Sequence, residues 1–250
     1  MYGEIIFGKN SVIEALKSGQ KIEKILLFKG LKEKKNLIEL INNYDNKIEV
    51  EEKSRQEIFN ICRSRKSGGV VAYIEKFKFT TIEDVLKESE KRNENLFMVI
   101  LDHIEDPRNL GAIMRSAEAA GCHGVIIPEK RGARISGTVV KASAGALFHL
   151  KIIRIVNIAR LIDILKNKGI WVIGVEREGE IAYFEADFNT PIALIFGSEG
   201  KGLKRLIREK CDYLIKIPMK GKVNSLNVSS AASVVFFEVL KQRGLFPYKS

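Results

Sequence analysis

Residues 97–121 decide the fold of this chain; they read Phe97-Met-Val-Ile-Leu-Asp-His-Ile-Glu-Asp-Pro-Arg-Asn-Leu-Gly-Ala-Ile-Met-Arg-Ser-Ala-Glu-Ala-Ala-Gly121. The first five residues form an apolar run without alternation, which is typical of a strand buried on both faces of a parallel sheet. Behind Pro107, apolar side chains recur at helical spacing, at Leu110, Ile113, Met114 and Ala117. The pattern predicts a strand, a short polar junction and a helix over 110–120 that Gly121 ends.

The same alternation of strand and helix continues toward the C-terminus. Further near-continuous apolar runs lie at 125–127, 150–156, 170–175, 192–196 and 213–217. Between and after them, the spacing predicts helices over 157–168, 203–209 and 228–243, the first and last of these followed by glycine. Strands that alternate with helices in this way predict a doubly wound α/β fold around a parallel sheet.

Residues 1–76 predict a separate and smaller α/β unit. Ser11 is followed three residues later by Glu14, which is the pattern of a capping box, so a helix is expected to begin there. Strands are expected at 24–28, 48–50 and 69–74, and helices around 37–41 and 56–63. The highly charged segment 77–95 predicts a linker with a surface helix, and 96–250 form the second domain.

The chain is basic throughout its length. Its 42 Lys and Arg residues against 31 Asp and Glu residues leave a net charge of +11 over 250 residues. Residues 1–76 hold 15 basic and 11 acidic groups (net +4), and the remainder holds 27 and 20 (net +7). Because neither part alone carries the excess, the charge favours a polyanionic partner, and nucleic acid above all.

Cysteine, histidine and apolar patterns exclude several other classes of protein. The three cysteines are odd in number and lie far apart, and no histidine pair has ligand spacing, so we expect neither disulfides nor a metal site. No apolar stretch approaches the roughly 20 residues that span a bilayer. The N-terminal residues lack the features of a signal peptide. These patterns predict a cytoplasmic protein that does not associate with a membrane.

Three polar, glycine-containing motifs each follow an apolar run of the second domain. They are segment 101–117 of the stretch quoted above, Leu194-Ile-Phe-Gly-Ser-Glu-Gly-Lys-Gly-Leu203, and Ile217-Pro-Met-Lys-Gly-Lys-Val-Asn-Ser-Leu-Asn-Val-Ser229. In open parallel sheets, ligands bind beyond the carboxyl ends of the strands. We therefore expect the three motifs to meet in one composite site.

The first motif carries two arginines seven residues apart on one helix face. With Asn109 at the helix start, Arg108 and Arg115 would hold a phosphate and orient a neighbouring hydroxyl; solvated arginines, or pairing with Glu118, are the alternatives. Asp102 and its acidic neighbours favour an electrostatic role at helix entry over Mg²⁺ binding.

The second and third motifs also offer polar side chains. Three glycines in 197–202 imply turns or close backbone approach to a ligand, and Glu199 is either a site carboxylate or a turn residue. In the third motif, Ser225, Asn227 and Ser229 cannot all cap the following helix. Asn227 or Ser225 is the expected cap, and the others remain for ligand binding.

Taken together, the three motifs resemble the SpoU (TrmH) family of RNA ribose 2′-O-methyltransferases, within the SPOUT superfamily. The resemblance covers most of 96–241, with all three motifs in order. It implies a parallel sheet whose C-terminal segment threads a deep trefoil knot, S-adenosylmethionine as cofactor, and a homodimer formed through the C-terminal domain.

The resemblance also implies roles for individual residues. Cofactor contacts fall on Gly197, Ile217 and Leu226, and catalytic or substrate positions fall on Asn109, Arg115, Glu199, Ser225 and Asn227. The arginine matched by Arg115 is the proposed general base of the family. Because arginine normally stays protonated, binding the adjacent phosphate and stabilising alkoxide charge is the alternative. In either role, Arg115 is expected to face the bend at Gly197 and the loop before Val228.

Residues 1–76 resemble the N-terminal RNA-binding domain of the family, which is similar to ribosomal protein L30e. This arrangement implies methylation of a guanosine in 23S ribosomal RNA; transfer-RNA and resistance-type ribosomal methyltransferases are the alternatives. Where many relatives have His-Gln-Gly, this chain has Ser67-Gly68-Gly69. Two other classes of protein predict different motifs: a non-catalytic RNA-binding protein should have broken cofactor motifs, and a nicotinamide-dependent oxidoreductase should have a G-x-G-x-x-G motif after its first strand.

Overall fold

The computed structural model describes residues 3–32, 34–45, 47–200 and 202–245, and it divides into two compact units. Unit 1 comprises residues 1–78 together with 134–149, and unit 2 comprises 79–133 together with 150–250. Segment 134–149, which sequence patterns place inside the second domain, is thus grouped by its contacts with the N-terminal residues.

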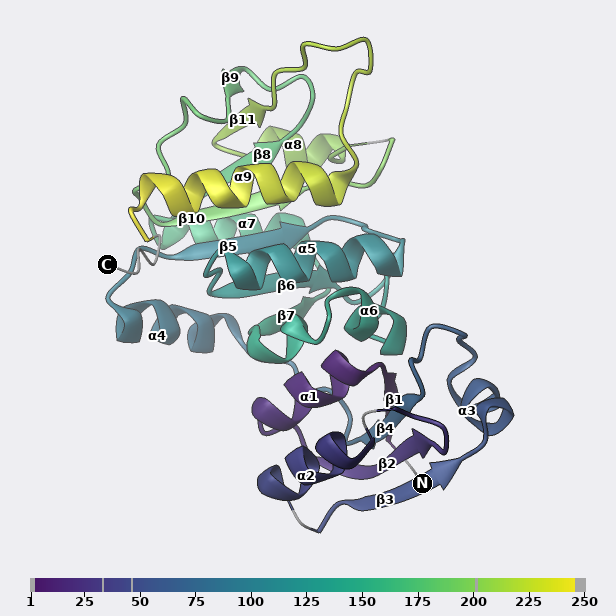
Figure 1. Ribbon diagram of the computed structural model, residues 1–250. Coiled ribbons are helices and arrows are strands. Elements are labelled where there is room, and N and C mark those ends of the chain that lie inside the picture. The colour runs from purple at the N-terminus through teal and green to yellow at the C-terminus, as the bar shows by residue number, and fades with distance from the viewer. Residues whose placement is uncertain (1–2, 33, 46, 201, 246–250) are drawn as a thin grey trace. The chain divides into compact units, whose positions relative to one another are not determined.

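Unit 1 is a four-stranded sheet in the order β1-β4-β2-β3, in which only β2 and β3 run parallel (Figure 1). Its elements are β1 (Glu4–Phe7), α1 (Lys9–Lys17), β2 (Ile22–Phe28), α2 (Lys34–Tyr44), β3 (Glu49–Lys53), α3 (Arg55–Cys62) and β4 (Val70–Ile74), with α6 (Gly137–Ala142) and the 3-10 helix η1 (Ala146–His149) from the later segment. Buried apolar residues of β2, α3 and β4, such as Leu26, Ile58 and Val71, form part of its core.

The predicted start of α1 is wrong. The helix begins at Lys9 behind Gly8, whose φ of 102° only glycine adopts readily, and Ser11 lies inside the helix. Ser11 is fully buried, with its hydroxyl 3.5 Å from the carbonyl oxygen of Val140 in α6. Glu14 pairs with His149 instead of completing a capping box. Contacts with segment 134–149 therefore engage Ser11 and Glu14, so that neither residue caps the helix. The local sequence pattern does not show these contacts.

Unit 2 is built on a seven-stranded sheet in the order β7-β6-β5-β10-β8-β11-β9, and every neighbouring pair is parallel. Its elements are α4 (Ile82–Arg92), β5 (Phe97–Leu101), α5 (Pro107–Ala119), β6 (Gly124–Pro128), β7 (Ile152–Ile155), α7 (Ile158–Asn167), β8 (Trp171–Val175), β9 (Ile181–Ala182), β10 (Ile192–Phe196), α8 (Arg205–Lys210), β11 (Tyr213–Lys216) and α9 (Val228–Gln242). The predicted α/β fold with a large parallel sheet is confirmed.

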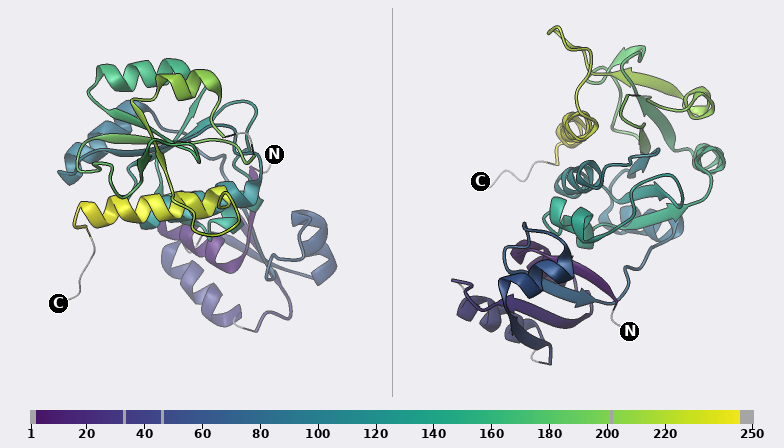
Figure 2. Two further views of the ribbon diagram at one scale, coloured as in Figure 1. Left: turned by 90° about the horizontal axis from the view of Figure 1, so that it is seen from above. Right: turned by 90° about the vertical axis from the view of Figure 1, so that its right-hand side faces the viewer.

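Helices cover both faces of this sheet (Figure 2). On one face, α4, α7 and α8 pack against alternate strand residues such as Met98, Ile100 and Ile195. On the other face, α5 and α9 lie side by side, and Phe236 of α9 makes edge-on ring contacts with Phe97 and Phe196. Burial of strand residues on both faces explains why the strands read as continuous apolar runs.

Glycine ends the helices where the sequence predicts it. Gly121, Gly169 and Gly244 have φ of 73°, 72° and 63°, the left-handed region that such positions require. The predicted surface helix within 77–95 is α4, capped by Thr81 and Asp84 in a capping box. One face of α4 is buried, because Val85 packs fully into the core of unit 2.

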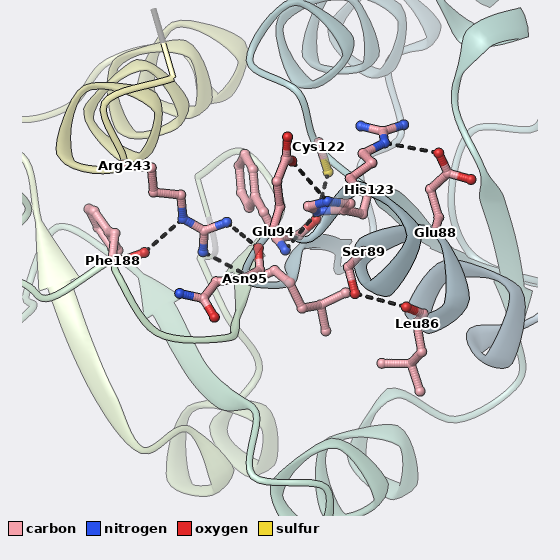
Figure 3. Close-up of polar contacts among 12 residues, drawn as sticks. Leu86, Glu88, Ser89, Glu94, Asn95, Cys122, His123, Phe188 and Arg243 are labelled. Carbon is pink, nitrogen blue, oxygen red and sulfur yellow. Dashed lines mark hydrogen bonds and ion pairs between the residues drawn. The ribbon is translucent and has the colours of Figure 1, made fainter.

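A partly buried polar cluster closes the amino-terminal edge of the sheet (Figure 3). At the end of α9, Arg243 donates hydrogen bonds to the carbonyl oxygens of Asn95, Leu96, Phe188 and Thr190. Burial lowers the pKa of Arg243 to about 10. Nearby, His123 Nδ1 accepts a hydrogen bond from the Phe97 N–H, and its Nε2 lies 3.2 Å from the Glu94 carboxylate. Burial, then Arg92 and Arg243, lower the pKa of His123 to about 4.

Candidate active site

The opposite, carboxyl-terminal edge of the sheet gathers the three sequence motifs. Strands β5, β10, β8 and β11 are consecutive in the sheet, so the loops that follow them emerge next to one another. The first motif follows β5, the second follows β10, and the third joins β11 to α9. The order of the strands therefore brings together segments that lie far apart in the chain.

One residue from each motif enters a hydrogen-bonded cluster. Asn109 Nδ2 and Asn227 Nδ2 each donate to Glu199 Oε1, both at 2.6 Å, and Asn227 Nδ2 lies 3.2 Å from Asn109 Oδ1. Asn109 is half-buried in the first turn of α5, while Glu199 and Asn227 are exposed. Two amide donors thus orient one carboxylate at the protein surface.

The same asparagine also caps α9. Asn227 Oδ1 accepts a hydrogen bond from the Ser229 N–H at 2.9 Å, which confirms one of the two expected caps. Ser229 Oγ donates to the same oxygen at 2.6 Å. Because Oδ1 binds the helix and Nδ2 binds Glu199, a single side chain ties the start of α9 to the polar cluster.

A cavity of about 640 Å³ lies beside this cluster. Its lining includes Gly197, Ile217 and Leu226, the expected cofactor contacts, together with the expected site residues Glu199, Ser225 and Asn227. The walls combine apolar side chains with exposed backbone and polar groups.

The bend at Gly197 requires glycine. A Cβ atom on this residue would collide with the backbone of Gly202 and Leu203, which pass directly against it. Gly200 and Gly202 have φ of 80° and 65°. Lys201 lies outside the described residues. The close approach leaves backbone groups of this bend on the cavity wall.

Four charged residues of the cavity were not singled out from the sequence: Glu176, Arg177, Glu178 and Arg208. Glu176, just after β8, accepts the Leu203 N–H at 2.9 Å and pairs with Arg208 Nε at 2.7 Å. Arg208 also binds Glu178 and, with Arg177, lowers the pKa of that exposed carboxyl. Residues 176–178 follow the apolar run at 170–175, so a search for polar residues at every strand end would have found them, whereas Arg208 in α8 has no such signal.

Arg115 does not join the cluster. It is exposed on α5, does not line the cavity, and makes no hydrogen bond or ion pair with any described residue. Six residues separate it from Asn109, which at 100° per residue turns it about 120° away around the helix. The expectation that Arg115 faces the bend of its own chain is therefore not met. Its neighbour Ser116 faces α9, where its hydroxyl lies 2.7 Å from that of Ser233.

The described residues offer no metal site, and burial keeps two of the three thiols protonated. Within the described residues, no group of three His, Cys, Asp or Glu side chains is arranged to hold a metal ion. Burial raises the pKa of Cys122 and of Cys211 to about 12, so both thiols stay protonated near neutral pH. Among the described helices, none is long and apolar enough to cross a membrane.

Comparison with known proteins agrees with this geometry. Residues 96–237 match the model of the SpoU rRNA methylase family, and residues 5–80 match a model described as RNA 2′-O ribose methyltransferase substrate binding. A Bacillus subtilis protein assigned to the TrmH family of tRNA/rRNA methyltransferases is 41% identical over 244 residues, which is 96% of either chain.

Solved structures match over the same extent. The SpoU methyltransferase AviRb from Streptomyces viridochromogenes, in complex with the cofactor AdoMet, has a TM-score of 0.80 and 26% identity, covering 96% of this chain and 90% of its own. An AdoMet-bound rRNA methyltransferase from Sinorhizobium meliloti has a TM-score of 0.76 and 26% identity, covering 95% and 87%.

Proposed function

The chain belongs to the SpoU/TrmH family of RNA 2′-O-ribose methyltransferases, and on this premise we propose that it methylates a guanosine ribose in 23S ribosomal RNA with S-adenosylmethionine. The observation that carries the proposal is the Asn109–Glu199–Asn227 cluster at the mouth of a cavity beyond the strand ends. There, a ligand in the cavity and a ribose held by the cluster would be adjacent.

The cavity residues fit the proposed cofactor. Gly197 presents backbone at a place that no other residue can occupy, and Ile217 and Leu226 supply apolar surface suited to an adenosyl group. When bound, S-adenosylmethionine would supply a sulfonium-bound methyl group, which an oxygen nucleophile would take up in one step as the bond from carbon to sulfur breaks and a neutral thioether leaves. We propose that these three residues hold the cofactor, largely through backbone contacts.

The cluster residues would prepare the ribose hydroxyl. A neutral hydroxyl is a weak nucleophile, so its alignment and the loss of its proton both control the rate. Glu199, fixed by two amides, would accept a hydrogen bond from the 2′-hydroxyl, and Ser225 at the cavity wall would contact the substrate. Asn109 and Asn227 would act by holding that carboxylate in place.

Arg115 would bind the substrate phosphate in the active site of the partner subunit. Its guanidinium is exposed and forms no ion pair among the described residues. Arg115 lies on α5, which packs beside α9. On α9, the apolar side chain of Phe237 is 44% exposed. We propose a homodimer through these helices of unit 2, in which Arg115 of one copy completes the site of the other. A protonated guanidinium there would bind phosphate and stabilise developing alkoxide charge.

The domain roles extend the same proposal. We propose residues 1–76 as the RNA-binding domain, 77–95 as the connection and 96–250 as the methyltransferase domain, supported by family matches over 5–80 and 96–237. We also propose that the C-terminal segment threads a trefoil knot. In support, the chain leaves β11 near one sheet edge and returns to pack α9 against α5 over the central strands. The basic charge and the RNA substrate fit a cytoplasmic location.

The test is to map 2′-O-methylation in ribosomal and transfer RNA from cells with and without this protein. The proposal expects one guanosine of 23S ribosomal RNA to lose its methyl group, and purified protein with S-adenosylmethionine to restore it. A lost methyl group in transfer RNA alone, or at a site tied to antibiotic resistance, would support the alternative substrates instead.

A further inference from the structure

Unit 1 contains a second cavity, of about 810 Å³, lined entirely by residues between Lys9 and Gly69. Its size falls within the roughly 300–1,000 Å³ range of small-molecule sites. Strand β2 ends at its wall with Phe28, α3 contributes Arg55 and Phe59 one helical turn apart, and the loop before β4 contributes Arg65. The cavity lies wholly within unit 1 and is separate from the site described above.

The lining has the composition of a nucleobase site. Leu37 and Ile58 are buried at the cavity, and Phe28 and Phe59 are half-buried there. Basic side chains surround them, whereas no Asp or Glu among the described residues lines the cavity. The remaining polar groups, such as that of Gln56, can donate and accept hydrogen bonds at a base edge.

The aromatic and cationic groups are also arranged for stacking. The guanidinium of Arg55 lies over the Phe28 ring, 5.4 Å from its centroid. A Cβ atom on Gly30 would lie 2.7 Å from the Phe28 ring, and one on Gly69 would lie 2.8 Å from Phe28 Cβ, so both glycines leave room for this side chain. The Phe28 ring is therefore closely packed against Gly30 and Gly69. It supports the flat guanidinium of Arg55, which lies one helical turn from Phe59.

Two arginines at the cavity, Arg55 and Arg65, form no ion pair among the described residues. On the neighbouring strand β3, by contrast, Glu51 is paired with Lys24 and Lys53. Both arginines are exposed. Cations that stay unpaired beside aromatic side chains match the two parts of a nucleotide, which are a flat base and an anionic phosphate.

We propose that this cavity binds one unpaired RNA nucleotide, with the base stacked against Phe59 and the Arg55–Phe28 pair and its phosphate held by Arg65. Bases in duplex RNA are stacked and out of reach, whereas those in loops and bulges can be extruded onto aromatic and guanidinium surfaces. The inference rests on the proposed RNA substrate, and it specifies that unit 1 recognises a single-stranded element of that RNA.

The test uses the full chain and two fluorescein-labelled probes, a short oligouridylate and the duplex that it forms with oligoadenylate. Fluorescence anisotropy gives the affinity for each as a function of salt. The single strand should bind more tightly than the duplex. Phe59→Leu, which keeps an apolar side chain but removes the ring, should weaken single-strand binding about 5- to 150-fold, whereas Phe59→Tyr should retain it.

Arg65→Gln should act differently from Phe59→Leu. Loss of one phosphate contact should reduce the slope of log affinity against log salt by about 0.7, whereas Phe59→Leu should leave that slope unchanged. Lys21→Gln removes the same charge from an exposed residue just before the opposite end of β2, and it should alter neither quantity. Any of three results would overturn the proposal. The first is an equal loss of single-strand affinity in Lys21→Gln and Arg65→Gln, and the second is an unchanged affinity in Phe59→Leu. The third is a duplex that binds as tightly as the single strand.

Calorimetry with S-adenosylmethionine on the same variants separates this inference from the proposed function. All variants should bind the cofactor with unchanged affinity, because the cofactor cavity lies in unit 2. A chain that fails to bind S-adenosylmethionine but shows the Phe59 effect would contradict only the proposed methyl transfer. A chain that binds it and methylates RNA, but shows no Phe59 effect, would contradict only the nucleotide cavity.

Discussion

At its first turn α9 meets exposed side chains, whereas just after its last turn Arg243 binds backbone carbonyl oxygens. Asn227 joins the start of the helix to Asn109 and Glu199, and Arg243 joins the end to four backbone carbonyls. Both ends use several polar contacts, but only the first leaves a carboxylate open to a ligand. Polar contacts at one sheet edge therefore leave a carboxylate accessible to a ligand, whereas those at the other edge satisfy backbone carbonyls.

Removing the guanidinium at the buried end should have the largest effect. Arg243→Met leaves the carbonyls of Leu96 and Phe188 without their donor, and we expect the free energy of unfolding to fall by about 3 to 5 kcal/mol. Urea unfolding measures this change. Lys241→Met, at an exposed lysine two residues earlier that pairs with Glu238, should cost less than about 1 kcal/mol. Equal costs in the two variants would remove the contrast between buried and exposed contacts.

At the exposed end, Arg115→Ala should lower turnover about 100-fold or more while cofactor affinity and stability stay near their original values. Single-turnover methylation and calorimetry measure these quantities. Arg160→Ala, at an exposed arginine on α7 across the sheet, is the matched control and should leave turnover unchanged. Near-normal turnover in Arg115→Ala would refute its role.

Mixing two impaired variants tests whether Arg115 acts across the dimer. In a heterodimer of Arg115→Ala and Glu199→Gln subunits, an arginine acting in trans leaves one site with both groups intact. The turnover of the mixture should then rise clearly above the mean of the two variants measured separately. If each arginine acts in its own subunit, every site in the mixture lacks one of the two groups, and turnover should stay at that mean.

The buried end should also respond to pH. The pKa of His123 lies near 4, below its ordinary value of 6.5, so between these values the unfolded chain binds more protons than the folded one. Stability from this group is therefore present above pH 6.5 and is lost on acidification toward pH 4. We expect a loss of about 2 kcal/mol between pH 7.5 and pH 5. His123→Asn, which keeps an acceptor for the Phe97 N–H, should reduce this slope in urea unfolding; an unchanged slope would contradict the assignment.

The smallest effect is expected for the carboxylate of the cluster. Glu199→Gln keeps the size of the side chain but removes its charge, and turnover should fall about tenfold, the loss of one charged hydrogen bond. Stability should stay within about 0.5 kcal/mol because the side chain is exposed. Glu180→Gln, at an exposed residue outside the cavity, is the control for charge. A large loss of stability in Glu199→Gln would mean that the cluster mainly supports the fold.

Sequence patterns predicted correctly those features of the structure that depend on residues near one another in the chain. Apart from the short strand β9, the order of strands and helices in unit 2, the burial of Leu110 and Met114, and the left-handed Gly121 all follow from periodicity and turn chemistry. The pattern failed at Ser11, because a neighbouring segment buries that side chain and Gly8 starts the helix instead.

The sequence by itself determined the parallel α/β fold, the family and the three motifs that carry its polar residues. Tertiary structure alone decided that Asn109, Glu199 and Asn227 share hydrogen bonds, although 90 and 118 residues separate the first from the other two. It also decided that Arg115 turns away from its own cavity, and that residues of β2, α3 and the loop before β4 enclose a second one. The physical reason is that periodicity encodes which face of an element is buried, whereas the order of strands in a sheet depends on packing among all elements at once.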